Sequence, residues 1–392
     1  MSDDVGHRRC LVAMNVKPFA LERFQSEWEH RVRFNLSESG VHPLSVRQLL
    51  GDGVALEALL DTPLIYTQTN GTPALRERIA ALHPGASAAH VLVTNGGSEA
   101  NFVTTWRLVQ PGDEVVVLVP TYMQVAGLVG AFGGIVREWP MVLDRAAGRW
   151  RPDLDALAAL VGPSTRAIVL CTPNNPTGAR LTAAELDAVA AAAARHGAWV
   201  VCDEIYRGAE LDGRESPSMW GRGERVVVTS GLSKAYGLPG LRVGWAVGPP
   251  EFVASLWEYH DYTSIAPGAL SDQLATAALS PDTRARLLTR TQGILRENLP
   301  RVEAWLAGCG HAFEWLAPEA GAFLFARYTL PVNSTTLVTR LREEESVLVV
   351  PGDHFGMDGY LRLGAGEQAD HVLAGLARVK AFLDRLAAVP AP

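Results

Sequence analysis

The sequence predicts an α/β fold: a large domain with a mostly parallel seven-stranded sheet, followed by a smaller α+β domain. Three observations lead to this expectation. Seven short runs rich in β-branched residues occupy the middle of the chain, each bounded by Gly, Pro or Asp. Helical stretches separate several of these runs, which is typical of parallel strands covered by helices on both faces. From about Pro281 the alternation gives way to a long charged helix and hairpin-like pieces.

The expected strands follow one another through the middle of the chain. They are HVLVT near Val91, EVVVLV near Val115, IVREW near Val136, AIVLC near Val169, WVVCDE near Val201, RVVVTS near Val227 and RVGWAVG near Val243. Among the intervening stretches, SEANFVTTWRLV and AAELDAVAAAAARH are expected helices. The second follows a capping box that runs from Thr182 to Glu185, a pattern that marks a helix start.

These elements divide the chain into three expected parts. Residues 1–45 form an N-terminal arm that returns to the small domain, residues 46–280 form the large ligand-binding domain, and residues 281–392 form the small C-terminal domain.

Composition narrows the possible partners. The chain has 392 residues, a formal net charge of −7 and no long basic run. Nucleic acid is therefore not an expected partner, because phosphate contacts require clustered Lys and Arg. No apolar run approaches the length that crosses a bilayer, and the N-terminal apolar patch is stopped by Lys17 and Pro18. We expect a cytoplasmic protein without a signal peptide.

The cysteines point the same way. The four are Cys10, Cys171, Cys202 and Cys309, with no CxxC pair and no histidine at zinc-like spacing. A structural metal site is therefore not expected. Cys171 and Cys202 lie in apolar strand-like runs, where cysteine behaves as a small hydrophobic residue.

Polar residues gather just after the expected strands. In open α/β sheets, ligands bind at the carboxyl ends of the strands. The residues at these positions are Asn95, Gly96, Gly97, Ser98, Thr121, Tyr122, Asn174, Asn175, Pro176, Thr177, Gly178, Asp203, Tyr206, Ser230, Ser233 and Lys234. Such a dense polar set at one edge of a sheet predicts a ligand.

The stretch TNGGSEAN joins a strand to a helix. Its glycines free the backbone, and the helix start offers unpaired N–H groups at the positive end of the dipole, which suits a phosphate. The stretch is not GxGxxG, so a dinucleotide is disfavoured. Glycine turns before helices are also common where no ligand binds.

Three charged residues in apolar surroundings extend the pattern. Asp203 ends a hydrophobic strand, where a carboxylate needs a cation or donors, although it would also serve as a helix cap. Lys234 follows a buried strand in a segment low in charge, the setting in which desolvation makes a lysine nucleophilic. Arg242 is flanked by Leu241 and Val243 and needs an anion, either a protein carboxylate or a ligand phosphate.

Taken together, these residues describe one ligand. They offer a phosphate site, an aromatic face, a phenolic oxygen, a carboxylate for a ring nitrogen and a lysine for an aldehyde. That combination predicts pyridoxal 5′-phosphate (PLP).

The sequence resembles the class I/II aminotransferases, the fold-type-I PLP-dependent enzymes. The resemblance extends from YTQTNGTPALRERIA to YLRLGAG and includes PNNPTG, DEIY and SKAYGLPGLRVGW in that order. It implies that residues 46–280 are the PLP-binding domain. It further implies a homodimer in which Tyr66 reaches the cofactor phosphate of the neighbouring subunit.

The resemblance also implies roles for individual residues. Lys234 would form the Schiff base with the cofactor and shuttle a proton, Asp203 would pair with the ring nitrogen, and Tyr206 and Asn175 would bind the ring 3-oxygen. The remaining implied contacts are Tyr122 on the ring face, Gly97, Ser98, Ser233 and Arg242 on the phosphate, Arg362 on the substrate carboxylate and Gly40 over the substrate.

One position departs from the family pattern. Many relatives carry Ser or Thr three residues before the lysine, where this chain has Gly231. Either one hydroxyl to the phosphate is missing or Ser230 supplies it.

The first functional hypothesis is transamination between an α-amino acid and a 2-oxo acid. The alternative keeps PLP but catalyses elimination, replacement or ring closure, because the arm SESGVHPLS resembles that of capreomycidine-synthase-like enzymes, which cyclise a modified arginine. Glu38 would then meet a cationic side chain, unless it is an exposed carboxylate. Retention of Tyr206 and PNNPTG keeps transamination first. His42 and Tyr262 are further candidates for the side-chain pocket.

Two other readings have less support. A non-catalytic cofactor-binding sensor would need an extra DNA-binding segment, which is not evident. A nicotinamide-dependent oxidoreductase would need an acidic residue after the second strand, where this chain has VPTY.

Overall fold

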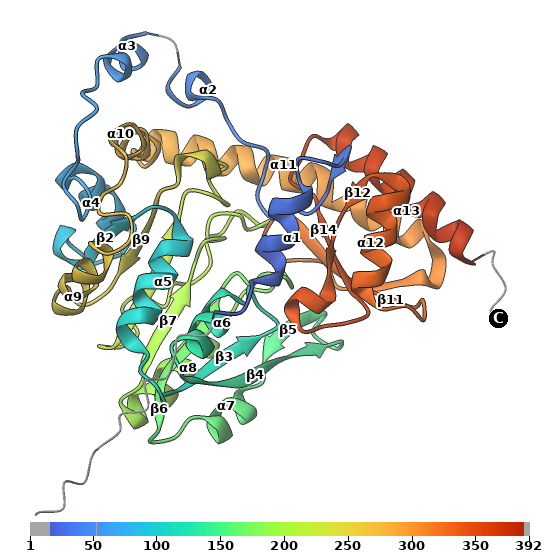
Figure 1. Ribbon diagram of the computed structural model, residues 1–392, viewed down its shortest axis with the longest axis horizontal. Coiled ribbons are helices and arrows are strands. Elements are labelled where there is room, and N and C mark those ends of the chain that lie inside the picture. The colour runs from blue at the N-terminus through green and yellow to red at the C-terminus, as the bar shows by residue number, and fades with distance from the viewer. Residues whose placement is uncertain (1–15, 52, 388–392) are drawn as a thin grey trace, which may run out of the picture.

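The computed structural model describes residues 16–51 and 53–387. Cys10 and the first fifteen residues of the expected arm lie outside these ranges. The described chain forms a large eight-stranded sheet with helices on both faces and, beside it, a four-stranded sheet with its own helices (Figure 1).

The large sheet contains all seven strands expected from the sequence and one more. Its order is β2-β9-β8-β7-β6-β3-β4-β5. The bounds are β2 Val91–Thr94, β3 Glu114–Val119, β4 Ile135–Asp144, β5 Arg149–Pro152, β6 Thr165–Cys171, β7 Trp199–Asp203, β8 Val226–Gly231 and β9 Gly244–Val247. The additional strand, β5, pairs with the far end of β4 in antiparallel register. Its sequence RWRP carries no β-branched residue, so it lacked the signal that marked the others.

Parallel pairing brings the ligand-binding edge together. Strands β4, β3, β6, β7 and β8 pair in parallel along the sheet. Next to β8 lies β9, which pairs in antiparallel register with β8 on one side and with β2 on the other. The carboxyl ends of β3, β6, β7 and β8 therefore meet at one edge, as the mostly parallel sheet predicted.

Helices cover both faces of this sheet, and alternate residues of one strand show it. In β3, Val116 and Leu118 pack in the cluster that includes Leu186, whereas Val115 and Val117 pack in the cluster that includes Val103. The helices on the first face are α7 Leu154–Leu160 and α8 Ala183–His196, and those on the second are α5 Gly97–Leu108, α6 Gln124–Ala131 and α9 Pro250–His260. The capping box at Thr182 and Glu185 starts α8 as predicted.

The small sheet has the order β10-β11-β14-β13 and antiparallel pairing throughout. Its strands are β10 Phe313–Trp315, β11 Phe323–Tyr328, β13 Val350–Pro351 and β14 Tyr360–Gly364. Its helices are α11 Pro281–Gly308, α12 Ser334–Glu345 and α13 Ala369–Ala387. Short 3-10 helices η1 Ala88–His90, η2 Pro239–Leu241, η3 Gly310–Ala312 and η4 Gly352–Phe355 complete the chain.

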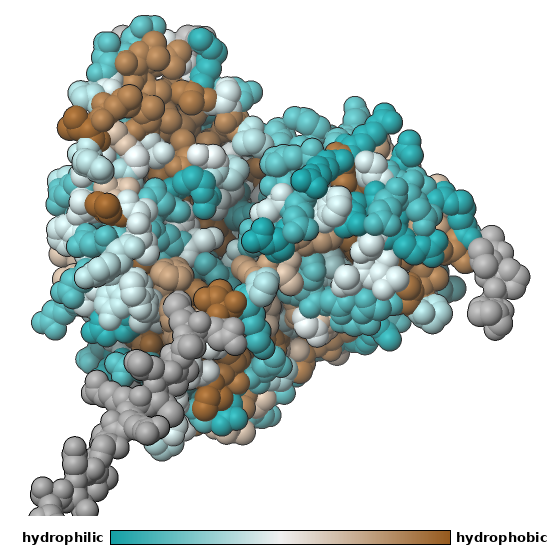
Figure 2. Space-filling model, viewed as in Figure 1, coloured by the Kyte–Doolittle hydropathy of each residue, from teal (hydrophilic) through white to brown (hydrophobic). Residues whose placement is uncertain are grey.

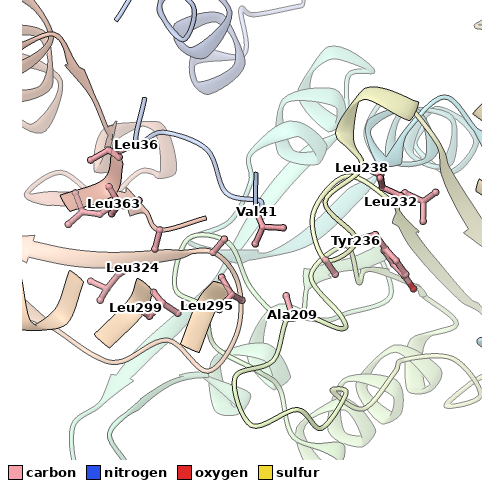
Figure 3. Packing of buried hydrophobic residues seen from close by; sticks show 14 of the residues in the cluster. Leu36, Val41, Ala209, Leu232, Tyr236, Leu238, Leu295, Leu299, Leu324 and Leu363 are labelled. Atoms are coloured by element: carbon pink, nitrogen blue, oxygen red, sulfur yellow. The ribbon is translucent and has the colours of Figure 1, made fainter. Parts of the chain in front are cut away.

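The N-terminal segment lies on the small sheet. After α1 (Ala20–Trp28), β1 (Phe34–Asn35) pairs in parallel with β12 (Val347–Leu348). The main chain continues this contact, since the amide of Gly364 donates to the carbonyl of Leu36 and that of His42 to the carbonyl of Gly366. Figure 3 shows Leu36 and Val41 in the apolar cluster that also holds Leu363. The boundaries at residues 45 and 280 stay predictions.

A second stretch of the N-terminal region stands away from the body. Helices α2 (Val46–Leu50) and α3 (Val54–Leu60) project from it before the chain returns at α4 (Pro73–Ala80) beside α10 (Ala269–Ala278) (Figure 1). Leu60, Leu64, Ile65 and Tyr66 are strongly exposed. Figure 2 shows an apolar surface over the projecting part.

Within residues 16–51 and 53–387, the longest helices are too polar or too short to cross a lipid bilayer.

Candidate active site

A pocket of about 290 Å³ opens where the strand ends of the large sheet face α1 and β14. Ten of the predicted site residues line it: Gly97, Ser98, Tyr122, Asn175, Asp203, Tyr206, Ser233, Lys234, Arg242 and Arg362. We call the side built at the strand ends the floor (Gly97, Ser98, Asn101, Asn175, Asp203, Tyr206, Ser233, Lys234 and Arg242). We call the side built by the N-terminal segment the arm wall (Glu22, Gln25, Ser26, Glu29, Glu38 and Ser39).

One end of the floor is shaped for an anion. Gly96 has φ +93° and precedes α5, whose first residues Gly97 and Ser98 open into the pocket. A side chain at position 96 would collide with the guanidinium of Arg242. Only glycine combines this backbone conformation with so close an approach. The helix N-terminus and the Arg242 guanidinium thus lie side by side, a donor set that fits a phosphate.

The departure at Gly231 has a steric reason. A Cβ at position 231 would lie 2.8 Å from the backbone oxygen of Val243, so a larger residue would not fit without a shift. The hydroxyl of Ser230 donates to the carbonyl of Glu204 at 3.2 Å, and Ser230 is not among the residues that line the pocket. Ser233 does line it and is the hydroxyl available on this side.

Asp203 lies on the floor at the end of β7. Its Oδ1 accepts from the amide of Ile205 at 3.0 Å, and its Oδ2 accepts from Nδ2 of Asn101 at 2.9 Å. Burial raises the pKa of Asp203, and these two donors oppose that rise. Within residues 16–51 and 53–387, no cation lies within ion-pair distance of this carboxylate. A protonated ring nitrogen would supply the missing charge.

Lys234 faces the arm wall across the pocket. Its Nζ lies 3.6 Å from Oε2 of Glu38, and this ammonium lowers the pKa of Glu38. Gly40 lies directly over the lysine, because a Cβ there would be 3.4 Å from Cδ of Lys234 and 3.2 Å from the carbonyl of Ser233. An amine that lines a pocket and contacts only a carboxylate across it, among the residues described, is placed to react with an aldehyde.

Arg362 joins the two sides of the pocket. It is 1% exposed; its Nη1 donates to Oδ1 of Asn175 at 2.8 Å and its Nη2 to the carbonyl of Ser37. Its Nε is buried without a hydrogen-bond partner. Burial lowers the pKa of Arg362. A buried guanidinium with an unpaired N–H at a pocket fits a carboxylate.

Neighbouring polar contacts hold the other floor residues. The side chains of Asn174 and Thr177 bond to each other at 2.8 Å, which fixes the loop that presents Asn175. Tyr206 donates to the hydroxyl of Ser39 at 2.8 Å, and Tyr122 donates to Glu22 at 2.7 Å. Burial raises the pKa of both phenols, so both hydroxyls stay protonated at neutral pH.

The structure leaves some predicted residues outside the pocket. Tyr66 is 82% exposed and contributes nothing to the lining within one chain. Of the candidates for the side-chain pocket, only Glu38 lines it. His42 accepts from or donates to Arg290 at 2.8 Å, and Tyr262 is exposed.

Sequence reasoning missed Asn101 and the whole of α1. Asn101 is the last residue of the TNGGSEAN stretch, four residues after Gly97, and therefore lies on the same helix face. Glu22, Gln25 and Glu29 have the spacing of one helix face, a signal that was available but has no distinctive chemistry on its own.

The family model described as "Aminotransferase class I and II" matches residues 47–376. The capreomycidine synthase of Streptomyces vinaceus is 32% identical over 363 residues, covering 92% of each chain. The arginine–pyruvate transaminase of Pseudomonas aeruginosa is 31% identical over 323 residues, covering 79% of this chain and 80% of that protein. Among solved structures, a PLP-dependent aminotransferase from Streptococcus suis superposes with a TM-score of 0.88 at 29% identity, covering 95% of this chain and 99% of that one.

Proposed function

We propose, from the premise that this chain belongs to the class I and II aminotransferase family, that its pocket transfers the amino group of an α-amino acid to a 2-oxo acid with PLP as cofactor. One observation carries the assignment of the site. Asp203, a carboxylate with no cation at ion-pair distance in the described part of the chain, and the amine of Lys234 line the same pocket as an anion cradle at Gly97 and Arg242.

The residues present fit the cofactor. Gly97, Ser98, Ser233 and Arg242 would hold its phosphate. The ring would take Asp203 at its nitrogen, Asn175 and Tyr206 at its 3-oxygen, and Tyr122 against its face. When bound, the cofactor supplies the electron sink for the carbanion that forms at the substrate Cα.

The chain's own residues then bind the substrate and move the proton. Arg362 binds the α-carboxylate and so fixes the direction in which the Cα–H bond points. The Lys234 amine would remove the proton from the substrate Cα and would deliver it to the carbon that was the aldehyde carbon of the cofactor. Glu38 stabilises the protonated amine between these two steps, since its carboxylate lies 3.6 Å from Nζ. The arm wall limits the access of water to this exchange.

Reduction of the purified protein with borohydride tests the anchor. The chain has three lysines, Lys17, Lys234 and Lys380. We expect a yellow protein that bleaches on reduction and carries the cofactor label on Lys234. Lys234→Ala should abolish transamination, whereas Lys380→Ala, on α13 and outside the pocket lining, should leave it unchanged. A colourless protein that ignores added PLP, or an active Lys234→Ala variant, overturns the proposal.

A second candidate function is ring closure or elimination on the same cofactor. The Glu38 carboxylate in the pocket and the similarity to a capreomycidine synthase favour it. Incubation with a panel of amino acids separates the two reactions. Accumulation of the pyridoxamine form of the cofactor supports transfer, whereas release of ammonia or a cyclised product without that form supports the alternative.

We further propose that the chain acts as a homodimer in the cytosol, with a role in amino acid metabolism and biosynthesis. The exposed apolar run from Leu60 to Tyr66 supports the dimer, because monomers rarely expose such patches. Tyr66 would then reach the neighbouring site. Light scattering should give twice the mass of the chain, and a monomer that is fully active contradicts this.

A further inference from the structure

The carboxylate of Asp203 is held by a second residue that is itself held by a third. Asn101 of α5 donates through Nδ2 to Oδ2 of Asp203 at 2.9 Å. Its Oδ1 accepts from the hydroxyl of Thr229 at 2.7 Å. Asn101 is 3% exposed and Thr229 is fully buried. Thr229 of β8 is the direct register partner of Asp203 in β7, so the three side chains form one compact group.

This arrangement fixes which way the amide of Asn101 points. A carboxamide has one oxygen that accepts and one nitrogen that donates. An ionised carboxylate only accepts, so it requires the nitrogen. The Thr229 hydroxyl then has the oxygen as its partner and must donate. The carboxylate therefore selects the orientation, and the Thr229 hydroxyl, which can donate or accept, donates in it and holds the amide in place.

The surroundings of Asp203 otherwise disfavour its charge. Cys171 of β6 and Tyr206 line the same pocket as Asp203, and neither of them is a cation. Burial works in the same direction. The donors that favour the charged form are the Ile205 amide and the Asn101 amide. The first is part of the main chain at the strand end, so Asn101 is the side chain on which the charge depends.

We propose that Asn101, oriented by Thr229, is a positioning residue that keeps Asp203 ionised and aimed into the pocket, and that this pair thereby selects a cofactor whose ring nitrogen can carry a proton. The inference rests on the proposed function, since it concerns how the chain holds PLP.

Binding of two cofactors to the apoenzyme tests it. One is PLP, and the other is a deaza analogue in which carbon replaces the ring nitrogen. A hydrogen bond to a charged group contributes enough that its loss weakens binding roughly tenfold or more. We expect Asn101→Leu and Thr229→Val each to raise the Kd for PLP by about tenfold and to change the Kd for the analogue by less than about twofold.

Two further variants separate positioning from folding. Thr229→Ser keeps the hydroxyl and should restore PLP affinity. Thr165→Val also removes a buried hydroxyl, at the end of β6 that lies away from the pocket, where Thr165 accepts from the Gly162 amide. It should leave the affinities for PLP and for the analogue unchanged. Nitrogen-15 NMR of labelled bound PLP provides a second measurement. The ring nitrogen should be protonated in the parent protein and shift toward the neutral form in Asn101→Leu.

The outcomes distinguish the possible failures. Equal weakening toward PLP and the analogue, or an unchanged Kd for PLP, overturns the role of Asn101. A parent protein that binds neither compound instead overturns the proposed function. Should Asn101→Leu fail to fold, Thr229→Val decides, because valine matches threonine in size and shape.

Discussion

The floor and the arm wall of the pocket are built differently. Floor residues Asn101, Asn175 and Tyr206 are each at most 3% exposed, and each side chain is hydrogen-bonded. The arm wall comes from α1, in which Leu21 is the buried residue, and from a segment whose Glu38 side chain is 41% exposed. We expect the buried floor to carry the chemistry and the more exposed carboxylates of the arm wall to influence the choice of substrate.

Substitution of Arg362 gives the largest expected effect on the contrast between the floor and the N-terminal segment, because Arg362 bonds to Asn175 of the floor and to the carbonyl of Ser37. Arg362→Lys keeps the charge but loses the planar fork that grips a carboxylate at two points. We expect kcat/KM to fall on the order of a thousandfold while the Kd for PLP changes little. Steady-state kinetics with a cofactor titration measures both. The control is Arg327→Lys on neighbouring β11, which is exposed and should behave like the parent. Equal loss in both quantities would mean that the two sides are not separable.

Glu99 tests how much the hydrogen bonds at the start of α5, the helix that carries Gly97, Ser98 and Asn101, contribute to stability. It lies in the first turn of α5 and accepts from Thr263, Ser264 and the Asn95 amide. Burial alone would raise the pKa of Glu99, but these bonds and His260 lower it to about 2. A lowered carboxylate pKa stabilises the fold above the unfolded value near 4.5, and the gain is lost as pH falls toward 2.

Glu99→Gln should therefore lower the free energy of unfolding by about 2 kcal/mol at neutral pH. The gap between the variant and the parent should close as the pH falls from about 5 toward 2. Denaturant titrations at several pH values measure it. Glu114→Gln, in an exposed pair with Arg137, is the matched control and should show a much smaller gap. A gap that stays constant with pH would show that Glu99 acts through shape and not through its charge.

The smallest expected effect concerns the arm wall. Glu38→Gln should reduce the preference for amino acids with cationic side chains over neutral ones by about tenfold, the scale of one charge-assisted bond. Cofactor affinity should stay within about twofold of the parent. Competition assays between paired substrates measure the preference. Glu27→Gln, on the same segment but outside the pocket lining, should leave it unaltered. A change in cofactor affinity instead would place Glu38 with the floor.

The contrast also explains what the sequence could predict. The seven β-branched strands and the strand-end residues from Gly97 to Arg242 were readable because strand periodicity and polar strand ends are local signals. The family pattern added Arg362, whose place in the pocket depends on β14 of a different sheet.

The α1 part of the arm wall was beyond sequence reasoning because its position depends on long-range contacts. Nothing in α1 itself states that Glu22 meets the hydroxyl of Tyr122, a hundred residues away. Asn101 escaped for a different reason. Its partners Asp203 and Thr229 come from separate strands, and only the parallel pairing of β7 and β8 brings them to one side chain. Strand β5 was missed because it has no β-branched residue and is held in place by its antiparallel pairing with β4.

The seam between the N-terminal segment and the small sheet has a mechanical consequence. Main-chain bonds join Leu36 to Gly364 and His42 to Gly366, and no side chain could be inserted at Gly366 because the carbonyl of Gly40 occupies that space. Glu38 and Arg362 therefore belong to one structural unit, which the N-terminal segment and the small sheet form together. We expect any displacement of the guanidinium toward a bound amino acid to carry the Glu38 carboxylate with it, because main-chain bonds connect their two segments.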